Sequence, residues 1–214
     1  MSALVACARS AACLPQGCGW LSGEEAARLA AITATQRREQ FLAARWLARG
    51  LLAQAAGGEP QDWSLTAGEA VKPTVIGHPE WHVAIAHSGE WVACAVAREA
   101  IGIDLEAPAR RRDIEGLVRL CCTEREQQLF AGLDASAQEA LFHELWTVKE
   151  SWLKRRGEWV APARLVRVEG QPGEPGEVRT WLGESWVLAL CGGQDVRWLG
   201  ELPLPLRTWQ VRDL

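Results

Sequence analysis

The sequence predicts an α+β fold made of two similar halves, in which helices pack on short antiparallel strands. Apolar residues recur at helical spacing over residues 22–55 and alternate at strand spacing over residues 81–106. The same order returns over residues 114–156 and 166–199. With 214 residues, the chain is long enough for one substantial domain or two small ones that share an interface.

The first half begins with a capping-box pattern, since Ser22 is followed three residues later by Glu25. We expect one helix from there to Ala55, ended by Gly57-Gly58. Beyond it, turn residues separate three runs of alternating apolar residues, which we expect to form a meander of three strands: 81–86, 91–97 and 101–106.

The second half shows an apolar stripe at helical spacing, closed by Gly157 and formed by Leu141, Leu145, Val148 and Trp152. Gly- and Pro-rich turns then separate short strand-like runs at 178–182, 186–191 and 196–199. Phe41–Leu52 has a helical counterpart about 100 residues later, at Phe142–Leu153. This echo favours an internal repeat with a cleft between its halves, which we divide into residues 1–98 and 99–214.

Composition excludes several classes of protein. The net charge of −4 gives no general attraction to nucleic acid or to an anionic membrane. No apolar run approaches the roughly 20 residues of a membrane span, and Arg9 interrupts a start that lacks the basic residues of a signal peptide. Seven cysteines without a CxxC pair are typical of reduced thiols. We therefore expect a cytoplasmic protein without nucleic-acid or membrane partners.

Acidic residues form the first candidate site. Asp104 and Glu106 are two residues apart on an expected strand, so both carboxylates project from one face. Glu150 and Lys154 lie one turn apart on an expected helix. Taken alone, each pair would also fit solvated acids at a strand edge and a surface salt bridge. Three carboxylates brought together would repel one another unless a cation bridged them, and an all-oxygen set suits Mg²⁺, with Mn²⁺ as the alternative.

Candidate phosphate contacts lie upstream of these acids. His87-Ser88-Gly89 offers an imidazole, a hydroxyl and a turn amide, and Lys72 precedes Pro73. A basic helical segment carries four arginines, namely Arg37, Arg38, Arg45 and Arg49. The chain lacks a GxxxxGK[ST] loop, which argues against a nucleotide kinase or ATPase.

Two segments resemble the signatures of the 4′-phosphopantetheinyl transferases. Residues 101–106 (IGIDLE) are similar to the first signature, and residues 146–154 (WTVKESWLK) to the second. Upstream, Lys72-Pro73 and residues 86–89 (AHSG) resemble two further family elements, and residues 121–128 resemble the segment that carries an acid, here Glu126. The length and the upstream elements are similar to those of the long, monomeric Sfp-type branch.

The resemblance implies a pseudo-two-fold α+β monomer with its active site between the halves. It implies transfer of 4′-phosphopantetheine from coenzyme A to a serine of an apo carrier protein, with release of 3′,5′-ADP. The metal ligands would be Asp104, Glu106 and Glu150, and the catalytic residues Glu150, Lys154 and Glu126. Coenzyme A would be bound by Arg38, Arg45, Lys72, Pro73, His87, Ser88, Lys149 and Lys154.

An acidic carrier would dock near the basic run of Arg110, Arg111 and Arg112. Two other functions remain open at this point. One is a different Mg²⁺-dependent enzyme that acts on phosphate esters or pyrophosphates, and the other is a coenzyme A-binding module without catalysis.

Overall fold

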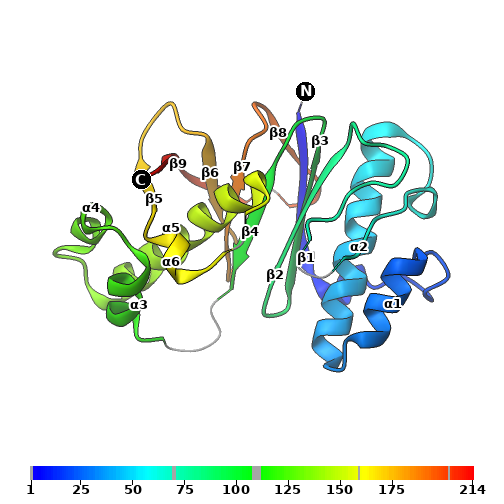
Figure 1. Ribbon diagram of the computed structural model, residues 1–214, viewed down its shortest axis with the longest axis horizontal. Coiled ribbons are helices and arrows are strands. Elements are labelled where there is room, and N and C mark those ends of the chain that lie inside the picture. The colour runs from blue at the N-terminus through cyan, green and yellow to red at the C-terminus, as the bar shows by residue number, and fades with distance from the viewer. Residues whose placement is uncertain (1, 69–70, 108–111, 159, 202) are drawn as a thin grey trace.

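Two β-sheets pack face to face, and each is covered on its outer face by one long helix (Figure 1). The computed structural model describes residues 2–68, 71–107, 112–158, 160–201 and 203–214. The first sheet has the strand order β2-β3-β1-β8, with bounds His82–Ser88, Trp91–Ala97, Ala3–Arg9 and Val196–Trp198. The second has the order β4-β7-β6-β9-β5, with bounds Gly102–Glu106, Val187–Cys191, Val178–Leu182, Leu204–Asp213 and Val168–Pro172.

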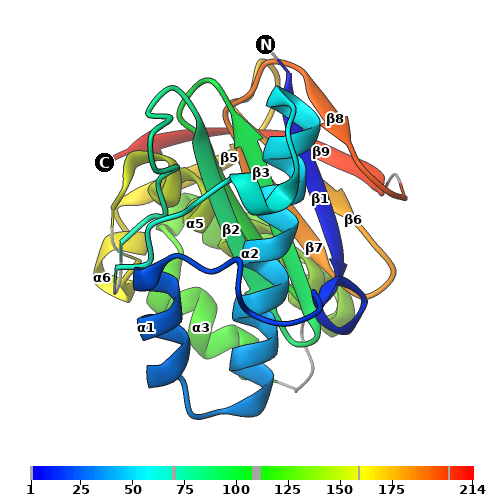
Figure 2. The same cartoon turned by 90° about the vertical axis from the view of Figure 1, so that its right-hand side faces the viewer.

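The long helix α2, Thr35–Ala56, covers the first sheet, and α5, Ala135–Arg156, covers the second (Figures 1 and 2). The shorter helices are α1 (Gly23–Ala31), α3 (Ile114–Cys121), α4 (Glu124–Gln127) and α6 (Pro162–Leu165). Three 3₁₀ turns complete the helical elements at Ser10–Cys13, Pro60–Asp62 and Gln128–Phe130. None of the helices in these described ranges is both long and apolar enough to cross a membrane.

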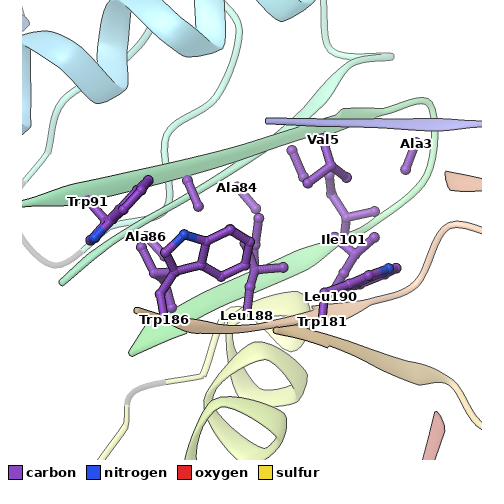
Figure 3. Packing of buried hydrophobic residues seen from close by; sticks show 14 of the residues in the cluster. Ala3, Val5, Ala84, Ala86, Trp91, Ile101, Trp181, Trp186, Leu188 and Leu190 are labelled. Carbon is purple, nitrogen blue, oxygen red and sulfur yellow. The ribbon is translucent and has the colours of Figure 1, made fainter. Parts of the chain in front are cut away.

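The core between the sheets joins the two halves of the chain. Val5 and Trp91 of the first sheet face Leu188 and Trp186 of the second (Figure 3). The rings of Trp91 and Trp186 meet edge to face, with centroids 6.0 Å apart, a favoured arrangement for aromatic pairs. Because this interface is apolar and buried, the halves hold a fixed relation at the cleft that they form.

The predicted duplication is confirmed by the topology. In the first half, α2 packs on the strand order β2-β3-β1, and in the second half α5 packs on β6-β7-β4. Both helices have 22 residues. The short strand β8 breaks the symmetry, since it comes from the C-terminal half and pairs parallel with β1 in the first sheet.

The expected meander of three strands was wrong in its third strand. The hairpin of β2 and β3 forms as predicted, but β4 pairs with β7 in the other sheet. The reason is that β3 already has a neighbour on each side, β2 and the N-terminal strand β1. The N-terminal segment, for which no strand was predicted, therefore forms an inner strand of the first sheet.

The single helix expected from Ser22 to Ala55 was also wrong, because the chain leaves the helix between α1 and α2. The capping box of Ser22 and Glu25 starts α1 as predicted. Ile32 and Ala34 then adopt extended backbone angles. The guanidinium of Arg38 donates to the carbonyls of Leu29 and Ile32, at 2.5 and 3.1 Å, and so caps the C-terminal end of α1.

Candidate active site

Strand β4 carries its acids on the face opposite the core. Ile103 and Leu105 point into the cluster between the sheets, as the alternation predicted. Asp104 points the other way, towards α5, and is 4% exposed. One strand therefore contributes both to the hydrophobic core and to the candidate site.

A close approach of α5 to β4 depends on Gly102. A Cβ atom at this position would lie 2.0 Å from the carbonyl oxygen of Ser151 and 2.4 Å from the backbone nitrogen of Arg155. No side chain fits in that space. Glycine in the IGIDLE segment thus lets the helix that carries Glu150 and Lys154 lie directly against the strand that carries Asp104.

Lys154 joins the two elements electrostatically. Its ammonium pairs with Asp104 and lies 3.1 Å from Oε2 of Glu150. Burial disfavours the charged ammonium, but the attraction of Asp104 and Glu150 outweighs this effect and raises the pKa of Lys154. Burial raises the pKa of Asp104 as well; Lys154 opposes that rise, and the nearby charges of Glu150 and Glu106 add to it.

Glu106 lies at the end of β4, beside the turn between β2 and β3. Ser88 of that turn donates from Oγ to Oε2 of Glu106 at 3.4 Å and accepts from the backbone N–H of Ala107 at 3.0 Å. Arg112 reaches the same carboxylate at 3.8 Å. Burial raises the pKa of Glu106, and Arg112 opposes the rise. The first half of the chain thereby positions an acid of the second half.

A cleft cavity of about 420 Å³ lies beside these acids. The second half lines it with Ile103, Glu150 and Lys154, and the first half with Lys72 and Ile85. The Lys72 ammonium donates to the carbonyl of Ile101 at 2.5 Å, so it is held at the junction of the halves. Burial, assisted by the charge of Arg155, lowers the pKa of Lys72.

A smaller basic pocket of about 200 Å³ adjoins the cleft cavity, and Val71, Pro73 and Ile85 line both. Its polar lining is cationic or neutral and comprises Arg28, Arg37, Gln40, Arg45 and His87. Burial and the charge of Arg28 lower the pKa of Arg37. No carboxylate is among the described residues that line this pocket, although Arg45 is paired with Glu25 at 3.4 Å. The lining therefore carries a net positive charge.

The His87 imidazole stays neutral at the rim of this pocket. Much of the side chain is exposed, yet desolvation and the charges of Arg37 and Lys154 lower its pKa. A neutral imidazole can donate one hydrogen bond and accept another.

Comparison with known proteins shows which family this chain resembles. Residues 100–200, which contain β4 and α5, match the model of the 4′-phosphopantetheinyl transferase superfamily. Over this stretch, which is slightly less than half of its length, the chain resembles that superfamily. The predicted resemblance, made from the IGIDLE and WTVKESWLK segments, is therefore confirmed.

Curated transferases of this superfamily align with most of the chain. The 4′-phosphopantetheinyl transferase HetI of Nostoc sp. is 29% identical over 172 residues, which cover 78% of this chain and 72% of HetI. A 4′-phosphopantetheinyl transferase of Bacillus subtilis is 29% identical over 194 residues, or 79% of this chain and 86% of the relative. The Sfp transferase of Bacillus subtilis (strain 168) is 32% identical over 111 residues, or 52% and 49% of the two chains.

One feature of the acids on β4 and α5 fits the binding of a divalent cation. Across the described ranges, no three carboxylate, imidazole or thiol side chains form a ready-made metal site, since the Lys154 ammonium lies between Asp104 and Glu150. Oδ2 of Asp104, however, is buried without a hydrogen-bond partner in the described part of the chain. A buried carboxylate oxygen left open in this way fits a hard cation.

The arginines are divided between the pocket and the scaffold. Arg45 lines the basic pocket, although its guanidinium also donates to the carbonyl of Thr66 at 2.6 Å. Arg38, predicted beside it, instead caps the end of α1. Arg37, which was among the candidate phosphate contacts but not in the predicted coenzyme A set, lines the pocket. The sequence spacing indicates that Arg37 accompanies Arg45, because Arg37, Phe41 and Arg45 recur every four residues on one helical face.

Glu126 and Lys149 form a buried ion pair of the scaffold. Lys149 is 1% exposed, and its ammonium donates to Glu126 at 2.6 Å and to the carbonyls of Cys121 and Leu165. Neither residue lines the cleft cavity or the basic pocket. The roles predicted for them, catalysis and coenzyme A binding, have no support in this placement.

The internal repeat explains this pair. In the first half, Glu25 closes a capping box with Ser22 and pairs with Arg49 of α2 at 2.5 Å. In the second half, Glu126 closes a capping box with Thr123 and pairs with Lys149 of α5. The two arrangements lie about 100 residues apart in sequence, so the Glu126–Lys149 pair is the second copy of a structural device.

Proposed function

We propose that this protein transfers the 4′-phosphopantetheine group from coenzyme A to a serine hydroxyl of an apo carrier protein. The observation that carries the proposal is the joining of Asp104 of β4 and Glu150 of α5 through Lys154, beside a cleft cavity that Glu150 and Lys154 line together with Lys72 of the first half. The match of residues 100–200 to the transferase superfamily supports it independently.

Coenzyme A fits the two connected cavities. Its 3′-phosphate is matched by the basic pocket, where Arg37 and Arg45 present cations and His87 presents a neutral donor. Its pyrophosphate then falls in the cleft cavity, between Lys72 and Lys154. Pro73 lines both cavities and so contributes a rigid wall to this path.

Asp104, Glu106 and Glu150 would hold Mg²⁺, or Mn²⁺, in this site. When bound, the ion supplies positive charge that offsets the charge growing on the pyrophosphate oxygens. Lys154 would then leave Asp104 and turn its ammonium towards the phosphate. Ser88 keeps Glu106 in place through its hydroxyl.

The chemistry is an in-line displacement at the β-phosphorus. Glu150 takes the proton of the carrier serine as the serine Oγ forms its bond to phosphorus. The bond between that phosphorus and the bridging oxygen breaks, and its electron pair leaves with 3′,5′-ADP. Lys154, one helical turn from Glu150, donates a hydrogen bond to the departing phosphate.

The partner is an acidic carrier protein, and the transferase works as a monomer in the cytoplasm. Arg112, which lies beside Glu106, would attract such a carrier. Arg110 and Arg111, the other members of the predicted basic run, lie outside the described residues.

The deciding experiment is intact-mass measurement of an apo carrier after incubation with the protein, coenzyme A and Mg²⁺. Transfer adds about 340 Da, the mass of the phosphopantetheine group, to the carrier. A hydrolase of phosphate esters or pyrophosphates would release products from coenzyme A and leave the carrier mass unchanged. A module that only binds coenzyme A would leave both molecules intact.

A further inference from the structure

The turn between β2 and β3 is held from two sides. On one side, Ser88 accepts from the backbone N–H of Ala107 at 3.0 Å and donates to Oε2 of Glu106 at 3.4 Å. Gly89 also lies against Ala107, since a Cβ atom built on it would be 3.6 Å from that residue's carbonyl oxygen. On the other side, helix α2 is hydrogen-bonded to Gly89. The turn therefore connects α2 of the first half to the end of the acid-bearing strand β4.

Two glutamines of α2 make the contact with the turn. The side-chain amides of Gln36 and Gln40 both donate to the carbonyl of Gly89, at 2.8 and 2.7 Å. A carbonyl oxygen has two lone pairs, so these two bonds satisfy it completely. Gln40 is 7% exposed, and a buried amide that lost its partner would be costly. The bond therefore fixes the distance between α2 and the turn.

Gln40 also belongs to the basic pocket. It lines the pocket together with Arg37 and His87, and the guanidinium of Arg37 donates to Oε1 of Gln40 at 3.4 Å. This bond sets the orientation of the amide, because Oε1 accepts from Arg37 and Nε2 is left to donate to Gly89. A chain of hydrogen bonds thus runs from a cation of the basic pocket, through Gln40 and the turn, to the carboxylate of Glu106.

The second half of the repeat folds without this contact. The β6–β7 turn, which begins at Gly183, is the counterpart of the β2–β3 turn, and α5 carries Ser136 and Ala140 at the positions of Gln36 and Gln40. Serine and alanine have no amide to donate, and Ser136, Ala140 and Gly183 instead line a cavity of about 780 Å³. Because the counterpart turn forms without glutamines, the shared scaffold does not account for them.

We propose that Gln40 is a positioning residue that sets the place of Glu106 through Gly89 and Ser88. The inference rests on the proposed function, in which Glu106 helps to hold the divalent cation. A carboxylate that shares a cation with acids of another element needs a fixed position, and loss of a partner of such a carboxylate typically lowers metal affinity by roughly 10–100-fold. Ser88 is the direct partner of Glu106, and Gln40 acts through it.

The first test is Gln40→Met, which keeps the length of the side chain but cannot donate to Gly89. With coenzyme A bound and no carrier present, the affinity for Mn²⁺, measured by electron paramagnetic resonance, should fall by roughly three- to tenfold, and kcat should fall with it. Gln54→Met is the matched control, because Gln54 is an exposed glutamine of the same helix and is not among the described residues that line the cleft cavity or the basic pocket. It should change neither value by more than about twofold.

The second test is a double-mutant cycle with Ser88→Ala. That variant alone should lower the affinity for Mn²⁺ by about tenfold. Because Gln40 acts through Ser88, adding Gln40→Met to Ser88→Ala should lower the affinity no further, whereas independent positions would have additive effects on the free energy of binding. Gln36→Met starts from an exposed position and removes the other bond to Gly89. Should Gln40→Met not fold, Gln36→Met repeats both tests with an expected loss of about threefold.

Three results would overturn the inference. One is an affinity for Mn²⁺ in Gln40→Met equal to that of Gln54→Met. Another is full additivity of Gln40→Met and Ser88→Ala in the cycle. The third is a change confined to the KM for coenzyme A, which would mean that Gln40 only contacts this substrate in the basic pocket. Failure of the proposed function looks different, since the unmodified protein would then add no mass to an apo carrier, whatever its affinity for Mn²⁺.

Discussion

The two halves share one framework but present opposite charges to the cleft. In each half a long helix packs on three strands, and a glutamate from a capping box forms a buried pair with a cation of that helix. The first half lines the basic pocket with Arg37 and Arg45 and the cleft cavity with Lys72, whereas the second half lines the cleft cavity with Glu150, Glu158 and Lys154, which sum to a negative charge. The duplicated scaffold stays constant, and the function comes from residues that the repeat does not share.

Gly50 and Glu150 show this divergence at one position. The two residues occupy corresponding places, 100 residues apart, in α2 and α5. A Cβ atom at Gly50 would meet nothing within 4 Å, whereas Glu150 contacts Lys154 and lines the cleft cavity. Only the second copy of the helix carries an acid at this point.

The largest expected effect concerns the buried ion pair that each half contains. Glu25→Gln and Glu126→Gln each leave a buried cation without its charged partner, so each should lower the free energy of unfolding by about 3–5 kcal/mol. Chemical denaturation measures both. The kcat of the folded fraction should remain near normal in both variants.

A different outcome for Glu126→Gln would restore its predicted catalytic role. That outcome is a loss of kcat of about a hundredfold in a variant whose stability is unchanged, with Glu25→Gln as the comparison.

The next largest effect concerns Glu150, which has no acidic counterpart in the first half. Glu150→Gln keeps the shape of the side chain but removes the charge that, in our proposal, holds the cation and accepts the serine proton. We expect kcat to fall by roughly 10²–10³ and the affinity for Mn²⁺, measured by electron paramagnetic resonance, to fall with it. Glu115→Gln, an exposed glutamate of α3, is the control. Near-normal turnover in folded Glu150→Gln would remove this residue from the mechanism.

Two glycine substitutions should act with opposite sign. Gly102→Ala forces β4 and α5 apart, because the new Cβ would overlap the backbone of Ser151, and should destabilise the protein by about 1–3 kcal/mol. Gly50→Ala fills open space inside a helix and should stabilise it by roughly 0.5–1 kcal/mol. Thermal unfolding measures both changes. Equal shifts in the two variants would contradict the close approach that we describe for α5.

A last pair of variants distinguishes two neighbouring arginines. Arg37→Ala removes a cation from the basic pocket and should raise the KM for coenzyme A about tenfold. Arg38→Ala removes the cap of α1 and should cost about 1 kcal/mol of stability while leaving that KM unchanged. Steady-state kinetics of both variants measure the KM for coenzyme A, and thermal unfolding measures their stability. The reverse pattern would return Arg38 to the phosphate site.

The sequence was sufficient to predict which strand and helix carry the acids, and to predict the repeat, but not the order of the strands in the sheets. Asp104 and Glu150 stood in short signatures whose strand and helix periods were clear. The pairing of β4 with β7, in contrast, depends on β1 filling the place beside β3, and no local pattern encodes such a long-range competition. β5 and β9, among Gly- and Pro-rich turns, were missed for the same reason.

The placement of cations was harder still. Arg37 and Arg38 are adjacent, and only the break between α1 and α2 decides which of them reaches the pocket. Lys149 was read from a signature beside Glu150, yet the helix turns it inward to Glu126. A motif fixes which residue types are present, and the rotation of the helix fixes which of them a ligand meets.

Strand β8 makes the two halves dependent on each other during synthesis. It covers one side of β1 only after residue 196 has been made, so a nascent first half exposes an unfilled edge to other chains. An N-terminal fragment that ended at the boundary of the repeat would lack β8, and its β1 edge would stay unpaired. If the protein is divided into two fragments, residues 196–198 should therefore be joined to the N-terminal fragment.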